Sequence, residues 1–380
     1  MKKKLLCRLF ALQFTLLTLS SQEMEQPPSN PVQSERAQNV SEEPEDEYDI
    51  PEENTIHPEP QRKHLTLKGE DHDLTKKQRD KFLTAHGKTL LALSLEQGAP
   101  YLPYIRQKLI ELNMPLELQY LPIVESNFKI TAVSKTGATG MWQFMENSMA
   151  PFLKKNSWYD ERLDPWLSTD AALTKLCDNY KMFGDWEIAI AAYNCGAGAM
   201  SRAKKKNPGK DFWALATSGA LRTQTAEYVP KLLAVCDIIL NAEYYGALEV
   251  GVAYHLTEEK KTDYSYVTTK GMYSLSEIAE EAGISKKVLE ELNPSLKRRC
   301  TPAGELYKLR VPKDMTLQVE ECLKHLGPPK NAIVHKVVKG DSLWALSRTY
   351  GISVQDLCKV NNIKENGILS IGQTIIIPIF

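Results

Sequence analysis

The stretch LTKKQRDKFLTAHGKTLLALSLEQ, residues 74–97, decides the fold of the first half of the chain. Its apolar residues recur at intervals of three and four, with polar residues between them, which is typical of a helix with one buried face. Similar patterns continue to about Tyr245, and no two strand patterns joined by a hairpin turn interrupt them. One helix is expected to start near Thr169 and Asp170 and to stop at Gly184. This part of the sequence therefore predicts one all-helical domain.

The N-terminus has the composition of an export signal. MKKK is followed by a short apolar stretch, and Ser20 and Ser21 then offer a cleavage site. We predict a signal peptide at residues 1–21, with an uncleaved membrane anchor as the alternative, and no lipid attachment at Cys7. Residues 22 to about 60 are rich in acidic residues, proline and serine, and we predict a disordered acidic tether over residues 22–70. The protein is expected to be exported and to lie in the periplasm or at the cell envelope.

The overall composition excludes some classes of protein. The 47 Lys and Arg balance the 48 Asp and Glu, so nucleic acid is not predicted as a partner. The seven histidines form no pair at the spacing of a metal site, and we predict no metal and no cofactor. An exported chain can form disulfides, but buried free thiols are an equal alternative. The cysteines concerned are Cys177, Cys195, Cys236, Cys300, Cys322 and Cys358.

The C-terminal third contains an internal repeat. The segments GMYSLSEIAEEAGISKKVLEELNPS, residues 271–295, and GDSLWALSRTYGISVQDLCKVNNI, residues 340–363, align with one adjustment. Leu289 then matches Leu357, for example, and Asn293 matches Asn361. Each copy is preceded by an alternating stretch and followed by a second strand pattern that ends in proline. The repeat predicts two modules of the order strand, helix, helix, strand, at residues 260–314 and 333–380.

The second copy resembles the LysM module, a small βααβ fold that binds glycans containing N-acetylglucosamine. The resemblance rests on V-x-K-G-D-S-L-W-x-L-S, G-I-S-V-x-D-L, N-N-I and L-S-I-G-Q-x-I-I-I-P, in that order. It implies that glycan lies along the loop of Gly340, Asp341, Ser342 and Leu343 and along a second loop, from Ile363 to Leu369. The first copy has G-M-Y-S, residues 271–274, in place of G-D-S, so we leave its glycan binding open.

Three motifs in the helical domain are candidates for chemistry. Glu125 ends an apolar run in LPIVESNF, residues 121–128; SKTGATGMWQF, residues 134–144, contains two glycines three apart; and AAYNCGAG, residues 191–198, ends an alanine-rich helix. Each has a purely structural interpretation as a solvated glutamate, a turn or a packed core. Glycines let backbone approach a ligand, and the polar side chains of these motifs suit sugar hydroxyl and acetamido groups. Their joint order and spacing favour a site.

Together these motifs resemble the soluble lytic transglycosylase domain, which has a helical, goose-type-lysozyme-like fold. E-S-x-F, S-x-x-G-A-x-G-M-W-Q-F and A-x-A-A-Y-N-x-G occur in the family's order, and the similarity covers about residues 90–242 of a predicted domain at 71–250. With LysM modules after it, the arrangement resembles the D type of membrane-bound lytic murein transglycosylase. The resemblance implies Glu125 as catalytic acid and base. It also implies substrate contacts by Ser134, Gln143, Tyr193, Asn194 and Tyr228.

Two positions depart from the family pattern. The family commonly has Glu-Thr-Arg/Lys-x-Tyr-Val near its late tyrosine, whereas this chain has Gln224 and, three residues later, Glu227. Cys195 stands where the family commonly has alanine. These departures leave open whether Glu227 takes the part of the missing glutamate.

The chemistry expected of this site needs one carboxyl. Desolvation among apolar neighbours such as Phe128 and Trp142 would raise the pKa of Glu125 and keep the carboxyl protonated near neutrality. It would then cleave the β-1,4 bond between N-acetylmuramic acid and N-acetylglucosamine and leave a 1,6-anhydro end. The alternatives are a lysozyme-type muramidase that uses water, and an inactive peptidoglycan-binding scaffold. We expect a monomer that binds peptidoglycan strands, with membrane association if the N-terminal segment is not removed.

Overall fold

The protein was analysed as a computed structural model that describes residues 60–259, 263–327, 329 and 332–378. The predicted signal peptide and residues 22–59 of the predicted tether lie outside these residues. Within the described ranges, every helix is too short or too polar to span a membrane.

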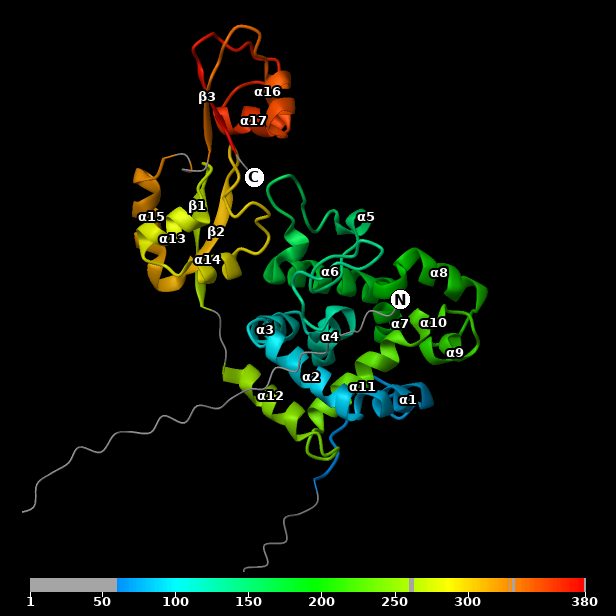
Figure 1. Cartoon of the computed structure of the whole chain (residues 1–380). Helices are drawn as coiled ribbons and strands as arrows, with labels where there is room; N and C mark the ends of the chain where they lie inside the picture. Colours follow the sequence, from blue (N-terminus) through cyan, green and yellow to red (C-terminus); the bar gives the residue numbers. More distant parts are fainter. Residues whose placement is uncertain (1–59, 260–262, 328, 330–331, 379–380) are drawn as a thin grey trace, which may run out of the picture. The chain divides into compact units, whose positions relative to one another are not determined.

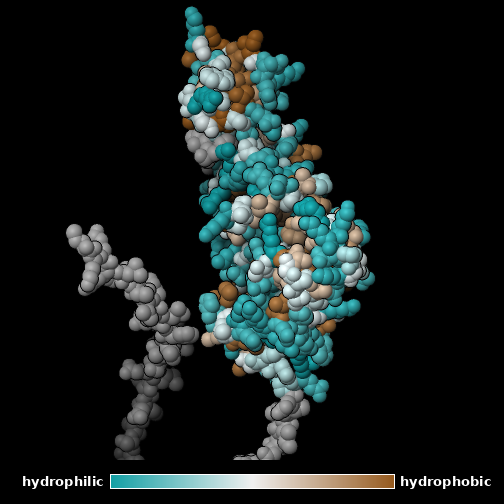
Figure 2. All heavy atoms as spheres, turned by 90° about the vertical axis from the view of Figure 1, so that its right-hand side faces the viewer, coloured by the Kyte–Doolittle hydropathy of each residue, from teal (hydrophilic) through white to brown (hydrophobic). Residues whose placement is uncertain are grey.

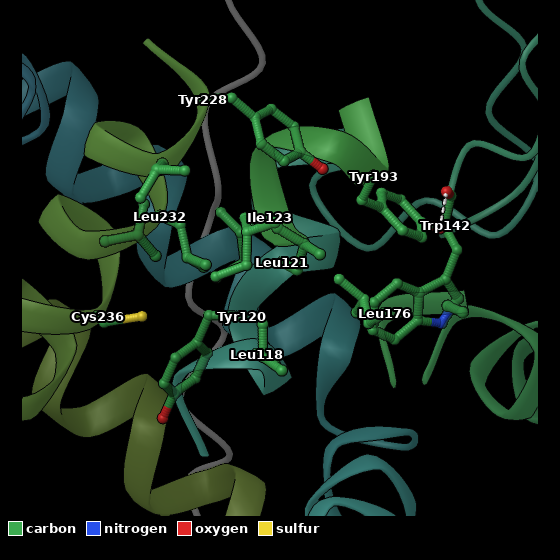
Figure 3. Packing of buried hydrophobic residues seen from close by; sticks show 14 of the residues in the cluster. Leu118, Tyr120, Leu121, Ile123, Trp142, Leu176, Tyr193, Tyr228, Leu232 and Cys236 are labelled. Carbon is green, nitrogen blue, oxygen red and sulfur yellow. Dashed lines mark hydrogen bonds between the residues drawn. The ribbon is translucent and has the colours of Figure 1, made fainter. Parts of the chain in front are cut away.

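The helical domain forms as predicted, from the amphipathic patterns of its sequence (Figure 1). Its short central helix α4 packs against α2 and α11, and Figure 3 shows Leu121 and Ile123 of α4 beside Leu232 of α11. The elements are α1 (Asp73–Phe82), α2 (Ala85–Gly98), α3 (Leu102–Glu111), η1 (Leu116–Tyr120), α4 (Leu121–Ser126), α5 (Glu146–Met149), η2 (Glu161–Leu163), α6 (Pro165–Phe183), α7 (Trp186–Cys195), α8 (Ala197–Lys206), α9 (Phe212–Thr217), α10 (Thr223–Ala226), α11 (Tyr228–Leu240) and α12 (Leu248–Glu259).

The start of α6 differs from the predicted one. The helix begins at Pro165, and the Asp164 carboxylate accepts hydrogen bonds from the N–H groups of Trp166 and Leu167. Proline suits the first helical position, because its fixed φ is helical and no N–H is needed there. The start predicted near Thr169 was therefore wrong, and the predicted end at Gly184 is confirmed by its left-handed φ of 69°.

The helical domain also begins earlier than residue 71. The Arg62 guanidinium donates to both carboxylate oxygens of the buried Asp237 side chain, at 3.1 and 2.9 Å. Thr66 donates through its backbone N–H and its hydroxyl to Glu117, and Leu67 is buried in the core. Residues 62–67, predicted as the end of the tether, are therefore part of the folded domain.

The two repeats form the predicted modules, each with one antiparallel strand pair. The first contains β1 (Tyr264–Thr269), α13 (Leu275–Ala282), α14 (Lys286–Leu292) and β2 (Tyr307–Pro312), and the second β3 (Ile333–Lys336), α16 (Leu343–Tyr350), α17 (Val354–Asn361) and β4 (Thr374–Ile377). After β2 come η3 (Lys313–Met315) and α15 (Thr316–His325). Val319 and Cys322 of α15 pack into the first module's core. That module therefore continues beyond the predicted limit of 314.

The asparagines that the repeat aligns have the same structural role. Asn293 donates from Nδ2 to the carbonyls of Leu289 and Arg310, at 2.9 and 2.7 Å, and accepts from the Arg310 N–H at 2.9 Å. Asn361 makes the same three bonds to Leu357 and Ile376. In each module, one asparagine amide, buried at Asn293 and half-buried at Asn361, thus ties the end of the second helix to the last strand.

The sequence left open whether the cysteines form disulfides or are buried free thiols. Among the described residues, all six carry free thiols, and only Cys177 and Cys195 are not fully buried. These residues therefore follow the buried-thiol alternative.

Candidate active site

Glu125 is held at the end of a helix that the local sequence terminates sharply. The helix ends at Ser126, and the two residues after it, Asn127 and Phe128, have positive φ angles of 54° and 60°. Phe128 is buried against Gly98, where an added Cβ would lie 2.7 Å from the Phe128 ring. The Ser126 hydroxyl donates to the Met141 carbonyl at 2.8 Å and so attaches this helix end to the glycine-containing loop. The position of Glu125 is therefore fixed from both sides.

The Glu125 carboxyl lies in a mostly apolar surrounding. Burial raises its pKa to about 7, while a hydrogen bond from the Tyr228 hydroxyl and the positive charge of Lys175 act in the opposite direction. Tyr228 is the first residue of α11 and is buried. The carboxyl can thus be protonated at neutral pH and can also lose its proton there, as an acid that later acts as a base requires.

The glycine-containing loop, residues 132–144, lies beside this carboxyl. Gly140 has a φ of 85°, and a Cβ added to it would lie 1.8 Å from the Arg162 carbonyl oxygen. Trp142 is completely buried and donates from Nε1 to the Thr169 hydroxyl of α6 at 2.9 Å. The predicted helix-start residue Thr169 therefore holds this loop against α6.

Ser134 and Gln143, both predicted to contact substrate, make hydrogen bonds within this loop. The Ser134 hydroxyl accepts from the Ala138 N–H at 3.0 Å and lies 3.1 Å from the Thr136 hydroxyl. Gln143 donates from Nε2 to the Gly140 carbonyl at 2.8 Å. Because these hydrogen bonds stay within the loop, both residues help to shape it. Both side chains are also partly exposed.

Tyr193 and Asn194 lie in the last turn of α7, and the Tyr193 hydroxyl is near enough to Glu125 for their charges to interact. The Tyr193 hydroxyl donates to the Trp142 carbonyl at 2.9 Å, and Figure 3 shows its ring near that of Tyr228. The Asn194 side chain accepts at Oδ1 from the Thr225 hydroxyl at 3.0 Å. Thr225 was not predicted as a functional residue, although it lies within the Q-T-A-E-Y-V stretch that was compared with the family. Its hydrogen bond orients the Asn194 amide and leaves the Nδ2 group to donate.

Lys175 is a second residue that sequence reasoning missed. Its ammonium nitrogen lies 4.9 Å from the centre of the Tyr193 ring and 5.4 Å from that of Phe144. Burial lowers the pKa of Lys175, and the negative charge of Glu125 acts against this effect. A lysine on an amphipathic helix is normally assigned to the solvent face, so the sequence around Lys175 did not indicate that it lies in the site.

The positions at which the sequence departs from the family pattern lie at the edge of the site. Gln224 is exposed, and Glu227 lies 3.9 Å from the Lys231 ammonium on the following turn. Glu227 is not among the groups whose charge affects Glu125. Cys195 is half-buried, and burial raises the pKa of its thiol. In the described residues, no group of three or more His, Cys, Asp or Glu is placed to hold a metal ion.

The predicted glycan-binding residues of the second module lie on two neighbouring loops. Gly340 has a φ of 100°; Asp341 accepts from the Val338 N–H and contacts the His335 ring, each at 2.8 Å, and these bonds hold the pKa of Asp341 below its usual range. Ser342 caps α16 by accepting from the Ala345 N–H. Leu343 is buried and Ile363 packs on the same core. Asp341, Ser342 and Leu343 thus help to build the first loop, and Gly340 and Ser342 are also part of its exposed surface.

Comparison with known proteins gives three family matches. The model described as "Transglycosylase SLT domain" matches residues 104–216, and that described as "LysM domain" matches residues 335–378. The model described as "Lytic transglycosylase MltD, LysM-like domain" matches residues 264–327. A lysozyme-like transglycosylase domain followed by LysM modules defines a lytic transglycosylase with peptidoglycan-binding modules, and this fold class and enzyme class are those predicted.

Individual relatives narrow the family assignment. The chain is 32% identical over 325 residues to membrane-bound lytic murein transglycosylase D of Escherichia coli (strain K12), covering 81% of this chain and 69% of that protein. The protein of the same name from Escherichia coli O6:H1 matches equally. A protein named for tributyltin chloride resistance, from Alteromonas sp. (strain M-1), is 34% identical over 193 residues, 46% of this chain and 92% of its own. The chain belongs to the family of membrane-bound lytic murein transglycosylase D.

Proposed function

We propose that this lytic transglycosylase cleaves the β-1,4 bond between N-acetylmuramic acid and N-acetylglucosamine with Glu125 as its single catalytic carboxyl. The proposal is carried by the desolvated position of the Glu125 carboxyl, which accepts a hydrogen bond from the Tyr228 hydroxyl and whose pKa burial raises to about 7. Glycosidases with two catalytic carboxyls place them about 5–10 Å apart. Burial, the Tyr228 hydroxyl and the positive charge of Lys175 cause the pKa shift of Glu125, and no second carboxyl is among these causes. We therefore assign both proton transfers to Glu125 alone.

The proposed reaction uses the same carboxyl twice. Protonated Glu125 gives its proton to the glycosidic oxygen as the bond to C1 breaks, and the muramyl acetamido group stabilises the positive charge at C1. The Glu125 carboxylate then takes the proton of the 6-hydroxyl of the same sugar as that oxygen attacks C1. A 1,6-anhydro ring closes and no water is consumed. An intramolecular nucleophile has a large advantage in effective concentration over one from solution.

The other predicted site residues have proposed roles that follow from their contacts. Asn194, oriented by Thr225, would donate to substrate from Nδ2. Gln143, whose Nε2 is bonded to the loop, would accept through its side-chain oxygen. Tyr193 uses its hydroxyl on a backbone carbonyl and would contribute the face of its ring, while Tyr228 supports Glu125 directly. Ser134 would act by holding the loop.

The second module would keep the enzyme on its polymer. Gly340, Asp341, Ser342, Leu343 and Ile363 mark the two loops where we propose that glycan binds. A module attached to the catalytic domain raises the effective concentration of bonds to cleave. We also propose export to the periplasm, with membrane association if residues 1–21 are retained. We also propose that the enzyme acts as a monomer.

Mass spectrometry of digested peptidoglycan sacculi tests this proposal. We expect anhydro-muramyl ends from the native chain and none from Glu125→Gln. As a control, Glu227→Gln removes a nearby carboxyl that does not act on Glu125 and should keep the products. Reducing muramyl ends instead would identify a muramidase that uses water, and no release by the native chain would identify a scaffold. Normal turnover by Glu125→Gln would refute the assigned residue.

A further inference from the structure

The two loops that would form a glycan groove in the first module are joined to each other. The N–H of Leu275 donates to the Arg299 carbonyl, and that of Thr301 donates to the Tyr273 carbonyl, each at 2.9 Å. The Thr301 hydroxyl also accepts from the Tyr273 N–H at 2.9 Å and donates to the Gly271 carbonyl at 2.7 Å. The loop between α14 and β2 therefore lies along residues 271–275 as an added strand would, and it occupies the backbone groups there.

The second module differs at the equivalent place. In its described residues, no hydrogen bond joins residues 338–343 to residues 363–371. Ile368 is 94% exposed and Ile371 is 72% exposed, whereas Thr301 in the first module is fully buried. Figure 2 shows hydrophobic side chains at the surface of this C-terminal module, uppermost in the view. Val337 pairs with Gly372 and Gln373 at the base of these loops, but beyond that pairing the loops are not joined in the second module, whereas they are joined in the first.

The same loop of the first module binds a segment of the transglycosylase domain. The Asp160 N–H donates to the Ser295 carbonyl, and the Lys297 N–H donates to the Trp158 carbonyl, each at 2.9 Å. The Arg298 side chain donates from Nε to the Ser157 carbonyl at 2.7 Å. These contacts pair the loop with the backbone of residues 156–160 on its other side.

Trp158 anchors this segment. Its side chain is completely buried and packs with Leu296 and Cys300 in the first module's core. Its Nε1 donates at 2.8 Å to the carboxylate of Asp356, in α17 of the second module, and that carboxylate also accepts from the Ser157 hydroxyl at 2.7 Å. A buried tryptophan with its N–H satisfied is the usual anchor of a stable interface.

We propose that the first module is a docking module whose ligand is residues 156–160 of this chain, and that it does not bind glycan. This inference rests on the proposed function only in taking the second module as the glycan-binding one. The bound segment leads directly to Asp164, which caps α6. Docking therefore also fixes the start of the helix that carries Thr169 and Lys175 of the active site.

Hydrogen exchange of the full chain tests the glycan part of this proposal. The Glu125→Gln variant would be measured with and without a soluble chitin oligosaccharide, so that the active site turns nothing over. We expect protection at residues 338–343 and 363–371 and none at 271–275 or 297–303. Protection at 271–275 would overturn the inference. Protection in neither module would contradict the proposed glycan binding of the second module, and the docking variants below would then decide the inference.

Two neighbouring arginines provide a matched test of docking. Arg298→Met removes the bond to Ser157, whereas Arg299→Met removes an exposed arginine whose ion pair is with Glu290 of its own module. A charge-assisted hydrogen bond of this kind corresponds to about a tenfold change in local opening. We expect Arg298→Met to speed exchange about tenfold at both 156–160 and 297–301, and Arg299→Met to leave 156–160 unchanged.

A stronger variant makes the same test. Trp158→Ala should speed exchange in residues 271–301, and Trp344→Ala, which removes an exposed tryptophan of the second module, should not. If Trp158→Ala does not fold, the Arg298→Met result decides. If exchange rises only at the substituted residue in Arg298→Met and in Trp158→Ala, then the segment and the module are independent. That result would overturn the inference.

Discussion

Glu125 combines burial with two groups that favour its charged form. Burial alone would keep the carboxyl protonated but would make it a weak acid, because the carboxylate left after proton transfer would be costly in an apolar surrounding. Tyr228 and Lys175 lower that cost, and the resulting pKa of about 7 lies near the middle of the physiological range. One carboxyl can therefore serve in both halves of the reaction.

The raised pKa of Glu125 makes stability depend on pH. Since the folded state holds the proton more tightly than the unfolded state, stability is undiminished below about pH 4 and falls as pH rises to 7, by about 3 kcal/mol. Glu125→Gln removes this loss. We expect the variant to unfold at a higher temperature than the native chain at pH 8 and at a similar temperature at pH 4. A difference that is the same at both pH values would contradict the raised pKa.

Lys175 is expected to set the alkaline limit of activity. Without its positive charge the pKa of Glu125 should rise further, so Lys175→Met should move the alkaline limb of the kcat/KM profile upward by about one pH unit. Lys175→Arg should keep the native limb. Lys181→Met is the control, because Lys181 lies on the same helix but is exposed beside Asp178. An unmoved limb in Lys175→Met would show that this charge does not act through Glu125.

Sequence motifs located the candidate site but not the partners within it. Glu125, Tyr193, Asn194 and Tyr228 stand in motifs whose residue types suit the chemistry, and the structure brings them together. Ser134 and Gln143 stand in such a motif too, yet their hydrogen bonds shape the loop. Which polar group bonds to backbone and which faces a ligand depends on loop geometry, which a motif does not contain.

At the scale of elements, the glycine-containing loop offers a matched pair of substitutions. Gly137 and Gly140 both have φ angles of 85°, but only at Gly140 would a Cβ meet backbone, the Arg162 carbonyl. Gly137→Ala should cost about 1 kcal/mol of unfolding free energy, from left-handed backbone strain alone. Gly140→Ala should cost at least about 3 kcal/mol and displace the loop. Chemical denaturation measures both, and equal losses would contradict the close approach to Arg162.

The start of α6 shows why element boundaries are hard to predict. Thr169 followed by Asp170 has the composition of a helix start, but Asp164 and Pro165 have it too. The structure uses Asp164, whose carboxylate also meets the Arg310 guanidinium. Arg310 is 146 positions away in the chain, so no local pattern could reveal the choice.

At the scale of the whole molecule, the buried pair of Asp164 and Arg310 connects the transglycosylase domain to the first module. The guanidinium carbon lies 4.6 Å from the centre of the Trp166 ring and 5.4 Å from that of Tyr264. Arg310→Met should cost about 3–5 kcal/mol of unfolding free energy, since Asp164 would remain buried without its cation. Adding Asp164→Asn should recover part of that loss in denaturation experiments. Strictly additive losses would show that the two charges are not coupled.

The domain order was predictable, and the contacts between distant segments were not. Helical and strand periodicities and the repeat with its aligned asparagines are local patterns, and the structure follows them. The predicted tether includes residues 62–67, yet the bond from Arg62 to Asp237 spans 175 positions and places them in the fold. Trp158 likewise belongs by sequence to one domain and by burial to the core of the next.

The asparagine that ties helix to strand in each module has an evolutionary consequence. Asn293 and Asn361 make the same bonds, while the loops at the other side of their modules differ in their hydrogen bonds. Because the fold of the module and its binding of a ligand depend on separate residues, a duplicated module can change its ligand and still fold. Duplication of one glycan-binding module would thus allow one copy to keep its glycan and the other to bind a segment of its own chain.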